Sequence, residues 1–182
     1  MIRWLLWMLG GAVLGGIVHL ATVLVLPRTA TQDAYARLAA LSPLINSFVI
    51  LPNPSAVDAP LPFMDPAFAS AVCRYDLSDG SLKFSAPVSP AYTSVSFYTR
   101  NGIAYYAIND RAAGRRVIEL ELMTTAQRAE LPDDEEITAA DRLIVESPTP
   151  TGLIVLRTFA PEPGLMPLAT VSLNGAKCEK PQ

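Results

Sequence analysis

Histidine and cysteine are scarce in this chain of 182 residues, and their scarcity excludes several kinds of catalytic site. The only histidine, His19, lies inside an apolar run, so the remaining chain cannot form a Ser-His or Cys-His catalytic pair. No G-x-S-x-G, H-E-x-x-H, C-x-x-C or glycine-rich phosphate-binding motif occurs. One histidine and two cysteines also cannot complete an ordinary zinc site outside that run. The sequence therefore predicts no metal, no cofactor and no specific reaction.

Basic charge is low as well. The chain has 14 Lys and Arg residues against 17 Asp and Glu residues, which gives a net charge of -3. It offers no basic patch for nucleic acid, so we expect no nucleic-acid partner. Sixteen prolines break the chain too often for a helical bundle and favour short strands and structured loops.

One long apolar run lies near the amino terminus. Trp4 to Leu26 contains no charged residue if His19 is neutral. As a helix it would be roughly 34 Å long, enough to cross a bilayer core of about 30 Å. The alternative is a cleaved secretory signal peptide, but the apolar region of such a peptide runs only about 7–15 residues. We expect residues 1–28 to form a retained signal-anchor, a single transmembrane helix in contact with lipid.

The cysteines bear on which side of the membrane holds the rest of the chain. Cys73 and Cys178 are an even pair, which suits one disulfide in an oxidising compartment; two buried reduced thiols are the alternative. The Lys and Arg bias around the apolar run is weak. Together these features favour a cytoplasmic amino terminus in the bacterial inner membrane, with the soluble part facing the periplasm.

Small residues follow one face of the predicted transmembrane helix. Gly11, Gly15 and His19 are spaced by four, so they share one side of the helix. Small residues at this spacing let two helices approach closely, and an intramembrane imidazole would seek a partner there. This pattern predicts helix association and an oligomer formed through the membrane. The alternative is a lone helix in which His19 bonds a backbone carbonyl or water.

Residues 29–63 differ from the chain that follows them. Thr29 to Leu41 favours a juxtamembrane helix, which Ser42-Pro43 would end. Four prolines in Leu44 to Phe63 exclude a long regular element and predict extended chain packed across the face of a domain. At the other end of the sequence, we expect residues 176–182 to be a polar tail.

Between them, residues 64–175 are expected to form a β-rich domain. Asp65-Pro66 predicts a short helix through Ala71, and Thr124 to Leu131 predicts another with a threonine cap. An acidic run at 133–136 favours a solvated loop over a calcium site, because it lacks the alternating ligand spacing. Elsewhere the apolar period is two. The predicted strands are Val72–Leu77 with Leu82–Ser85 as a hairpin around Asp79-Gly80, Tyr92–Thr99 with Ile103–Ile108 as a hairpin around Asn101-Gly102, Ile118–Leu122 with one wet face, Leu143–Ser147 paired with Leu153–Thr158, and Leu168–Leu173.

These elements predict the fold class. A single transmembrane helix precedes a mainly-β (α+β) domain, antiparallel and sandwich-like or jelly-roll-like, with two or three short helices.

One group of polar residues is a candidate for ligand binding. In a strand, Arg74 and Asp76 point to one face and Tyr75 to the other. Strand ends and the turns that follow them are common places for sites, although an Asx turn with a surface ion pair is the alternative. The candidates are Arg74, Tyr75, Asp76, Tyr98, Arg100, Asn109, Asp110 and Arg111.

Several motifs in order resemble the DUF1254 family, in its short, membrane-anchored alphaproteobacterial form. They are Asp65-Pro66-Ala67-Phe68, the run from Ala71 to Gly80, the run from Tyr92 to Tyr98, and Asn109-Asp110-Arg111-Ala112. The resemblance covers roughly residues 42–173. It implies a β-rich body of jelly-roll or sandwich character, often encoded beside or fused to a DUF1214 domain, and no established reaction. This chain has no room for the DUF1214 half, so that half would have to be a separate partner protein.

Three functional hypotheses remain. The first is an envelope protein whose anchored β domain binds a partner protein or a small apolar molecule. The second is a membrane-tethered hydrolase-like enzyme that uses Asp76 or Asp110, which would require convergence of these groups in one pocket. The third is an accessory subunit of a membrane complex, docked through the Gly11 and Gly15 face.

Overall fold

The computed structural model describes residues 1–29, 33–55, 59–113, 116–131 and 143–181. The chain divides into two units, Met1–Asp33 and Ala34–Gln182. The acidic run at 133–136 lies outside the described residues.

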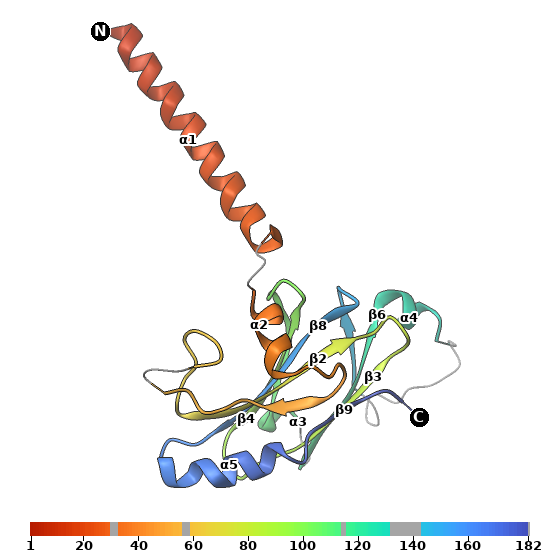
Figure 1. Cartoon of the computed structure of the whole chain (residues 1–182). Coiled ribbons are helices and arrows are strands. Elements are labelled where there is room, and N and C mark those ends of the chain that lie inside the picture. The colour runs from red at the N-terminus through yellow and green to blue at the C-terminus, as the bar shows by residue number, and fades with distance from the viewer. Residues whose placement is uncertain (30–32, 56–58, 114–115, 132–142, 182) are drawn as a thin grey trace. The chain divides into compact units, whose positions relative to one another are not determined.

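The first unit is a single helix, α1, from Ile2 to Thr29 (Figure 1). Its segment Ile2–Leu26 is 25 residues long and apolar enough to cross a membrane. The predicted amino-terminal apolar helix is confirmed.

The second unit contains two β-sheets. Neighbouring strands are antiparallel except for β6 and β7, which are parallel. The five-stranded sheet has the order β1-β2-β8-β4-β5, formed by Phe48–Ile50, Phe68–Asp76, Thr151–Phe159, Thr93–Thr99 and Ala104–Asn109. The four-stranded sheet has the order β7-β6-β3-β9, formed by Leu143–Ser147, Val117–Thr124, Leu82–Pro87 and Lys177–Glu179. The mainly-β prediction is confirmed.

The main core lies between the inner faces of the two sheets, because alternate residues of each strand point inward. On β3, Phe84 is buried, and its ring contacts Phe97 of β4 at 6.0 Å between ring centroids. It also contacts Phe48 of β1 at 5.8 Å. Aromatic contacts therefore join the two sheets through side chains that are far apart in the sequence.

Short helices cover the sheets. α2, Ala34–Leu41, lies on the outer face of the five-stranded sheet, where Leu38 is fully buried. α5, Met166–Leu173, follows the 3-10 helix η1, Pro163–Leu165, and packs on β2 and β8. The remaining two are α3, Asp110–Ala113, and α4, Thr125–Ala129. In α4 the predicted Thr124 cap is confirmed, and Gln127 completes a capping box.

Two predicted strand pairs are wrong. β2 and β3 do not form a hairpin, since β2 pairs with β1 and β8 while β3 pairs with β6 and β9. β7 and β8 likewise belong to different sheets. The two turns meet where the Leu77 amide donates to the Pro150 carbonyl at 2.8 Å. Each turn carries the chain from one sheet to the other. The alternation of apolar and polar residues along a strand does not show which sheet the strand joins.

Two element types are also wrong. Asp65-Pro66 does not begin a helix: Asp65 accepts a hydrogen bond from the Ala67 amide at 2.9 Å, and β2 starts at Phe68. The segment from Leu168 to Leu173 is not a strand but part of α5, in which Ala169 and Leu173, four residues apart, are buried. In addition, the segment expected to be a polar tail contains β9, whose Cys178 is buried.

The other predicted hairpin is confirmed. β4 and β5 pair around Asn101-Gly102, and Gly102 has φ +80, a conformation that favours glycine. On β6 the wet-face prediction holds only in part. Glu119 is exposed, but Glu121 is only 7% exposed and accepts a hydrogen bond from the Ser81 hydroxyl at 2.5 Å.

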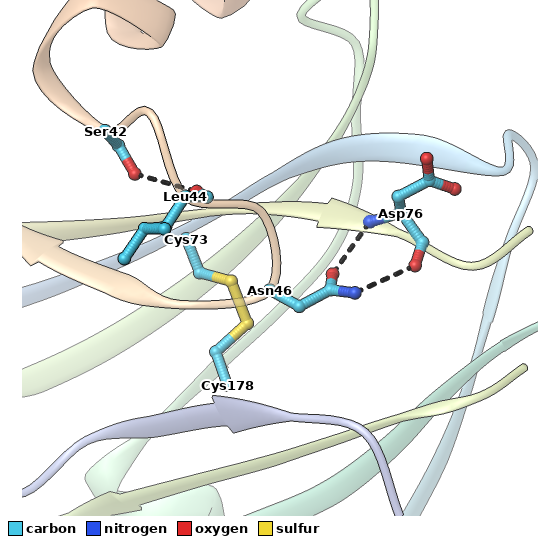
Figure 2. The surroundings of a disulfide bond; sticks show 6 residues. All are labelled: Ser42, Leu44, Asn46, Cys73, Asp76 and Cys178. Atoms are coloured by element: carbon cyan, nitrogen blue, oxygen red, sulfur yellow. Dashed lines mark hydrogen bonds between the residues drawn. A yellow bond between two sulfur atoms is a disulfide. The ribbon is translucent and has the colours of Figure 1, made fainter. Parts of the chain in front are cut away.

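A disulfide joins Cys73 of β2 to Cys178 of β9, so it connects the two sheets across the core (Figure 2). The bridged residues are 105 positions apart. Beside it, the Asn46 side chain accepts from the Asp76 amide at 2.8 Å and donates to the Asp76 carbonyl at 3.1 Å. These bonds fix the chain that leads from α2 into β1 against the end of β2.

Candidate functional site

The outer face of the five-stranded sheet carries a pocket of about 270 Å³. α2, Leu51 and residues 61–65 form its other walls. Its apolar lining comes from both the sheet and these covering segments. The same side chains form a second, smaller hydrophobic core. These apolar side chains are Leu38, Leu51, Leu61, Met64, Leu153 and Val155.

Phe63 lines this pocket, yet its side chain is fully exposed. Its backbone has φ +61, in the left-handed region that bulky residues rarely adopt. Backbone strain of this kind is concentrated at functional sites. The exposed Phe63 ring and its strained backbone both mark the pocket as a candidate site.

The pocket also has a polar side, which comes mainly from the sheet. Arg157 of β8 lines it, together with Ser70 of β2 and Tyr98 of β4. Register places Arg157 opposite Ser70 on one neighbouring strand and opposite Ser94 on the other. The structure records no ion pair or hydrogen bond of the Arg157 side chain with the residues that it describes. The fourth polar lining residue is Asp65, whose carboxylate accepts from the Ala67 amide.

Two arginines gather on Tyr35 of α2 next to this pocket. The guanidinium carbon of Arg74 is 4.6 Å from the ring centroid, and that of Arg100 is 4.2 Å away. Both distances fit cation-π contacts. Arg74 also donates to the Ser42 carbonyl at 2.9 Å, while its Nε is buried without a hydrogen-bond partner. These contacts hold α2 against the sheet and place positive charge at this end of the outer face.

The candidates predicted from sequence do not form one site. Arg74, Tyr98 and Arg100 come together near α2, on the outer face. Tyr75 points the opposite way, as predicted, and is fully buried in the main core. Asn109, Asp110 and Arg111 lie at the far end of β5, where the Asn109 side chain accepts from the Ala112 amide at 3.0 Å.

Asp76 and Asp110 lie too far apart to act on the same substrate atom. Asp76 pairs with Thr151 of β8. Asn109, next to Asp110, pairs with Ser94 of β4, which in turn pairs with Arg157 of β8. Thr151 and Arg157 are six positions apart on β8, which corresponds to about 20 Å along the strand. Hydrogen bonds from Ser78 hold the pKa of Asp76 below its usual value, so this carboxyl remains ionised as part of a turn.

Tyr75 instead takes part in an interior hydrogen-bond cluster. Its hydroxyl lies 3.0 Å from the Tyr105 hydroxyl and 2.9 Å from Oγ of Ser147, and it donates to the Tyr98 carbonyl at 3.3 Å. Burial raises the pKa of Tyr105, so its phenol stays neutral. Gly152 makes this cluster possible, because a Cβ there would overlap the Tyr75 hydroxyl and the Tyr98 carbonyl oxygen.

Sequence reasoning missed several pocket residues, namely Leu38, Phe63, Ser70 and Arg157. Arg157 could have been noticed, because it interrupts the apolar strand LIVLRTF at an outward position. The other three gave no such indication, since their role depends on segments that meet only in the folded chain.

Gly11, Gly15 and His19 lie on one face of the continuous helix α1, and association through that face stays a prediction. Within the described ranges, no group of three or more His, Cys, Asp or Glu side chains could hold a metal ion.

The sequence of the β-rich unit matches a known protein family. The pattern of DUF1254, a protein family of unknown function, matches residues 45–179. The chain belongs to the DUF1254 family. No curated protein matches its sequence significantly.

Two solved structures resemble this DUF1254 protein. The VPA0106 protein from Vibrio parahaemolyticus matches with a TM-score of 0.57 and 12% identity, over 81% of this chain and 34% of that one. An uncharacterised protein from Burkholderia cenocepacia matches with a TM-score of 0.49 and 14% identity, over 71% of this chain and 36% of that one. The chain thus spans about a third of the length of the solved structures it matches. At this identity, the first match shows a shared fold alone.

Proposed function

We propose that this protein is a membrane-anchored binding protein of the bacterial envelope. In this proposal, α1 spans the inner membrane and the β-rich unit faces the periplasm. The length and the uncharged composition of Ile2–Leu26 support the anchor. The Cys73–Cys178 disulfide supports the oxidising side of the membrane.

Washing of membranes that carry the full chain tests the anchor. We expect the protein to stay in the membrane pellet through high salt and alkaline carbonate, because an apolar span is not held by ionic contacts. Protease added outside spheroplasts should digest the β-rich unit. Release by salt alone, or a mature chain that lacks residues 1–28, would contradict this part of the proposal.

We further propose that the β-rich unit binds a small, largely apolar ligand in the pocket under α2. The observation that carries this proposal is the pocket itself, with apolar walls, a few polar groups on one side and about 270 Å³ of space. Small-molecule sites are typically mostly apolar with a few placed polar groups, and this pocket has that composition. Its volume is close to the roughly 300 Å³ at which such sites start.

A filled pocket provides the test. Val155→Trp would place a large ring among the lining side chains. Ala107→Trp, at an exposed position on β5, two strands away on the same face, is the matched control. Full-length variants are purified in lipid nanodiscs, and bound small molecules are identified by mass spectrometry. We expect a co-purified ligand with the native chain and the control, and its loss in Val155→Trp. Equal ligand content in both folded variants would exclude this pocket.

A second candidate function is docking of a DUF1214 protein. α5 has no charged residue, and its outward side chains Leu168 and Val171 are 69% and 66% exposed. With Leu165 they form an apolar stripe that is exposed to water. Exposed apolar patches of this kind are typical of protein interfaces. The match covers only 34% of the Vibrio chain, so that chain contains further protein beyond the shared fold. We propose that a separate DUF1214 chain covers this stripe.

A pull-down from native membranes tests docking. Leu168→Glu with Val171→Glu adds two negative charges to the stripe. Lys83→Gln with Lys177→Gln changes net charge equally on the exposed face of the other sheet. We expect the first pair to lose a co-purifying DUF1214 protein and the second pair to retain it. Retention by both would show that α5 is not the docking surface.

A further inference from the structure

Arg157 gives the pocket under α2 a charge that an entirely apolar ligand would not require. It lines the pocket, with Ser70 on the neighbouring strand directly opposite and also lining it. Ser94 stands opposite Arg157 on the other side. Opposite side chains on adjacent strands have Cβ atoms about 4.5–5.5 Å apart, so the two serine hydroxyls flank the base of the Arg157 side chain. Guanidinium and hydroxyl donors in this arrangement suit a carboxylate or another small anion.

The rest of the pocket suits an aliphatic chain. Leu38, Leu51 and Leu153 are buried there, and Leu61 and Val155 are partly buried against them. Phe63 extends this apolar surface outward, because its ring is fully exposed where it lines the pocket. A ligand with an apolar chain and one charged end would therefore satisfy both sides of the pocket.

In the proposed function, α1 tethers the β-rich unit to a bilayer. Such a tether raises the local concentration of membrane amphiphiles around the unit that carries the pocket.

Building on the proposed binding function, we propose that the pocket binds a single-chain anionic amphiphile from the adjacent bilayer, of the fatty-acid class. Its aliphatic chain lies between α2 and the sheet, and its carboxylate bonds to Arg157 with the Ser70 hydroxyl. Asp65 opposes this binding electrostatically, because it is the acidic residue among the lining side chains. Its neutralisation should therefore strengthen binding of the acid, and removal of the Arg157 charge should weaken it.

The test compares two photoactivatable probes with the same chain, diazirine-bearing hexadecanoate and diazirine-bearing hexadecanol. Each is added to nanodiscs of phosphatidylcholine that hold the full-length protein, and labelled peptides are mapped by mass spectrometry. We expect the acid to label the peptides around Leu61 and Val155 roughly tenfold more than the alcohol, as a charge-assisted hydrogen bond predicts. Arg157→Gln should remove this preference, and Asp65→Asn should increase labelling by the acid. Arg128→Gln, on exposed α4, is the matched control and should change neither.

The outcomes separate this inference from the function on which it rests. If acid and alcohol label the pocket equally, and Arg157→Gln has no effect, the pocket binds apolar chains but the anionic class is wrong. If the acid labels other peptides only, the inference is also wrong. If neither probe labels the pocket and no co-purified ligand is lost in Val155→Trp, then the proposed ligand-binding function fails as well.

Discussion

The outer faces of the two sheets show how the same alternation of residues can serve opposite purposes. On the five-stranded sheet, the outward residues Val72 and Leu153 are buried under α2. On the four-stranded sheet, Lys83 pairs in register with Glu121, and Ser85 with Glu119. Lys177 and Glu179 of β9 continue this charged surface at the edge.

This difference explains where a ligand site can form. The charged face interacts favourably with water and gains little from a cover. The apolar face must be covered, and its described cover consists of the short helix α2, Leu51 and residues 61–65. Such a cover packs incompletely, and the pocket of about 270 Å³ is the space that it leaves.

The largest difference between the two faces is expected when a charge is placed at an outward position of each sheet. Val72→Asp would bury a carboxylate under α2, and we expect a loss of about 4 kcal/mol of unfolding free energy. Ser85→Asp, on the charged face, should cost less than about 0.5 kcal/mol. Chemical denaturation of both full-length variants measures the difference. Similar losses would mean that the first face is not covered as described.

The second test removes the covalent link between the sheets. Replacement of Cys73 and Cys178 by alanine should lower the unfolding free energy by about 3 kcal/mol, because a disulfide across a long loop restricts the unfolded chain. Denaturation with and without reductant checks this, and the reduced native chain should behave like the double variant. A native chain that is insensitive to reductant would contradict the bond.

The third test concerns the inner side of β8, between the two sheets. Gly152→Ala should cost about 2 to 3 kcal/mol, because its Cβ would overlap the Tyr75 hydroxyl and the Tyr98 carbonyl oxygen. Gly164→Ala is the matched control, since a Cβ there meets nothing within 4 Å. Thermal unfolding distinguishes them. If both variants unfold at the native temperature, the Tyr75 cluster has a different arrangement.

The smallest expected effect is the pH dependence of Asp76. Its lowered pKa means that it stabilises the fold above its ordinary pKa of 3.8, and that this contribution is lost as pH falls through the folded value. Asp76→Asn should lose below about 0.5 kcal/mol at pH 7, since the side chain is largely solvated. The difference from the native chain should shrink near pH 3. A constant difference across this range would exclude an ionised role.

Parts of the fold follow directly from local sequence, and other parts do not. Asn101-Gly102 specifies a tight turn, so the β4–β5 hairpin was predictable. Asp79-Gly80 also specifies a turn, but the strands beside it join different sheets. The α5 segment has the apolar character of a buried strand, and periodicity over so short a run does not distinguish the two.

The candidate site shows the same division. The opposite faces of Arg74 and Tyr75 were predictable, because alternation alone fixes the face of a strand residue. The approach of Arg74 and Arg100 to Tyr35 was not, because it depends on how distant segments meet. The contribution of Leu38 and Phe63 was not predictable, because it arises only when α2 and residues 61–65 meet β2 and β8 in the folded chain.

Local sequence is enough to specify the apolar helix, the strand-rich character of the remaining chain and the orientation of side chains within each strand. Length, charge and a period of two are short-range properties, and they act before distant segments meet. The pairing of strands into sheets, the approach of Cys73 to Cys178 and the position of the pocket are fixed only in the folded chain. Those features depend on contacts between residues far apart in the chain, whose energies no local pattern records.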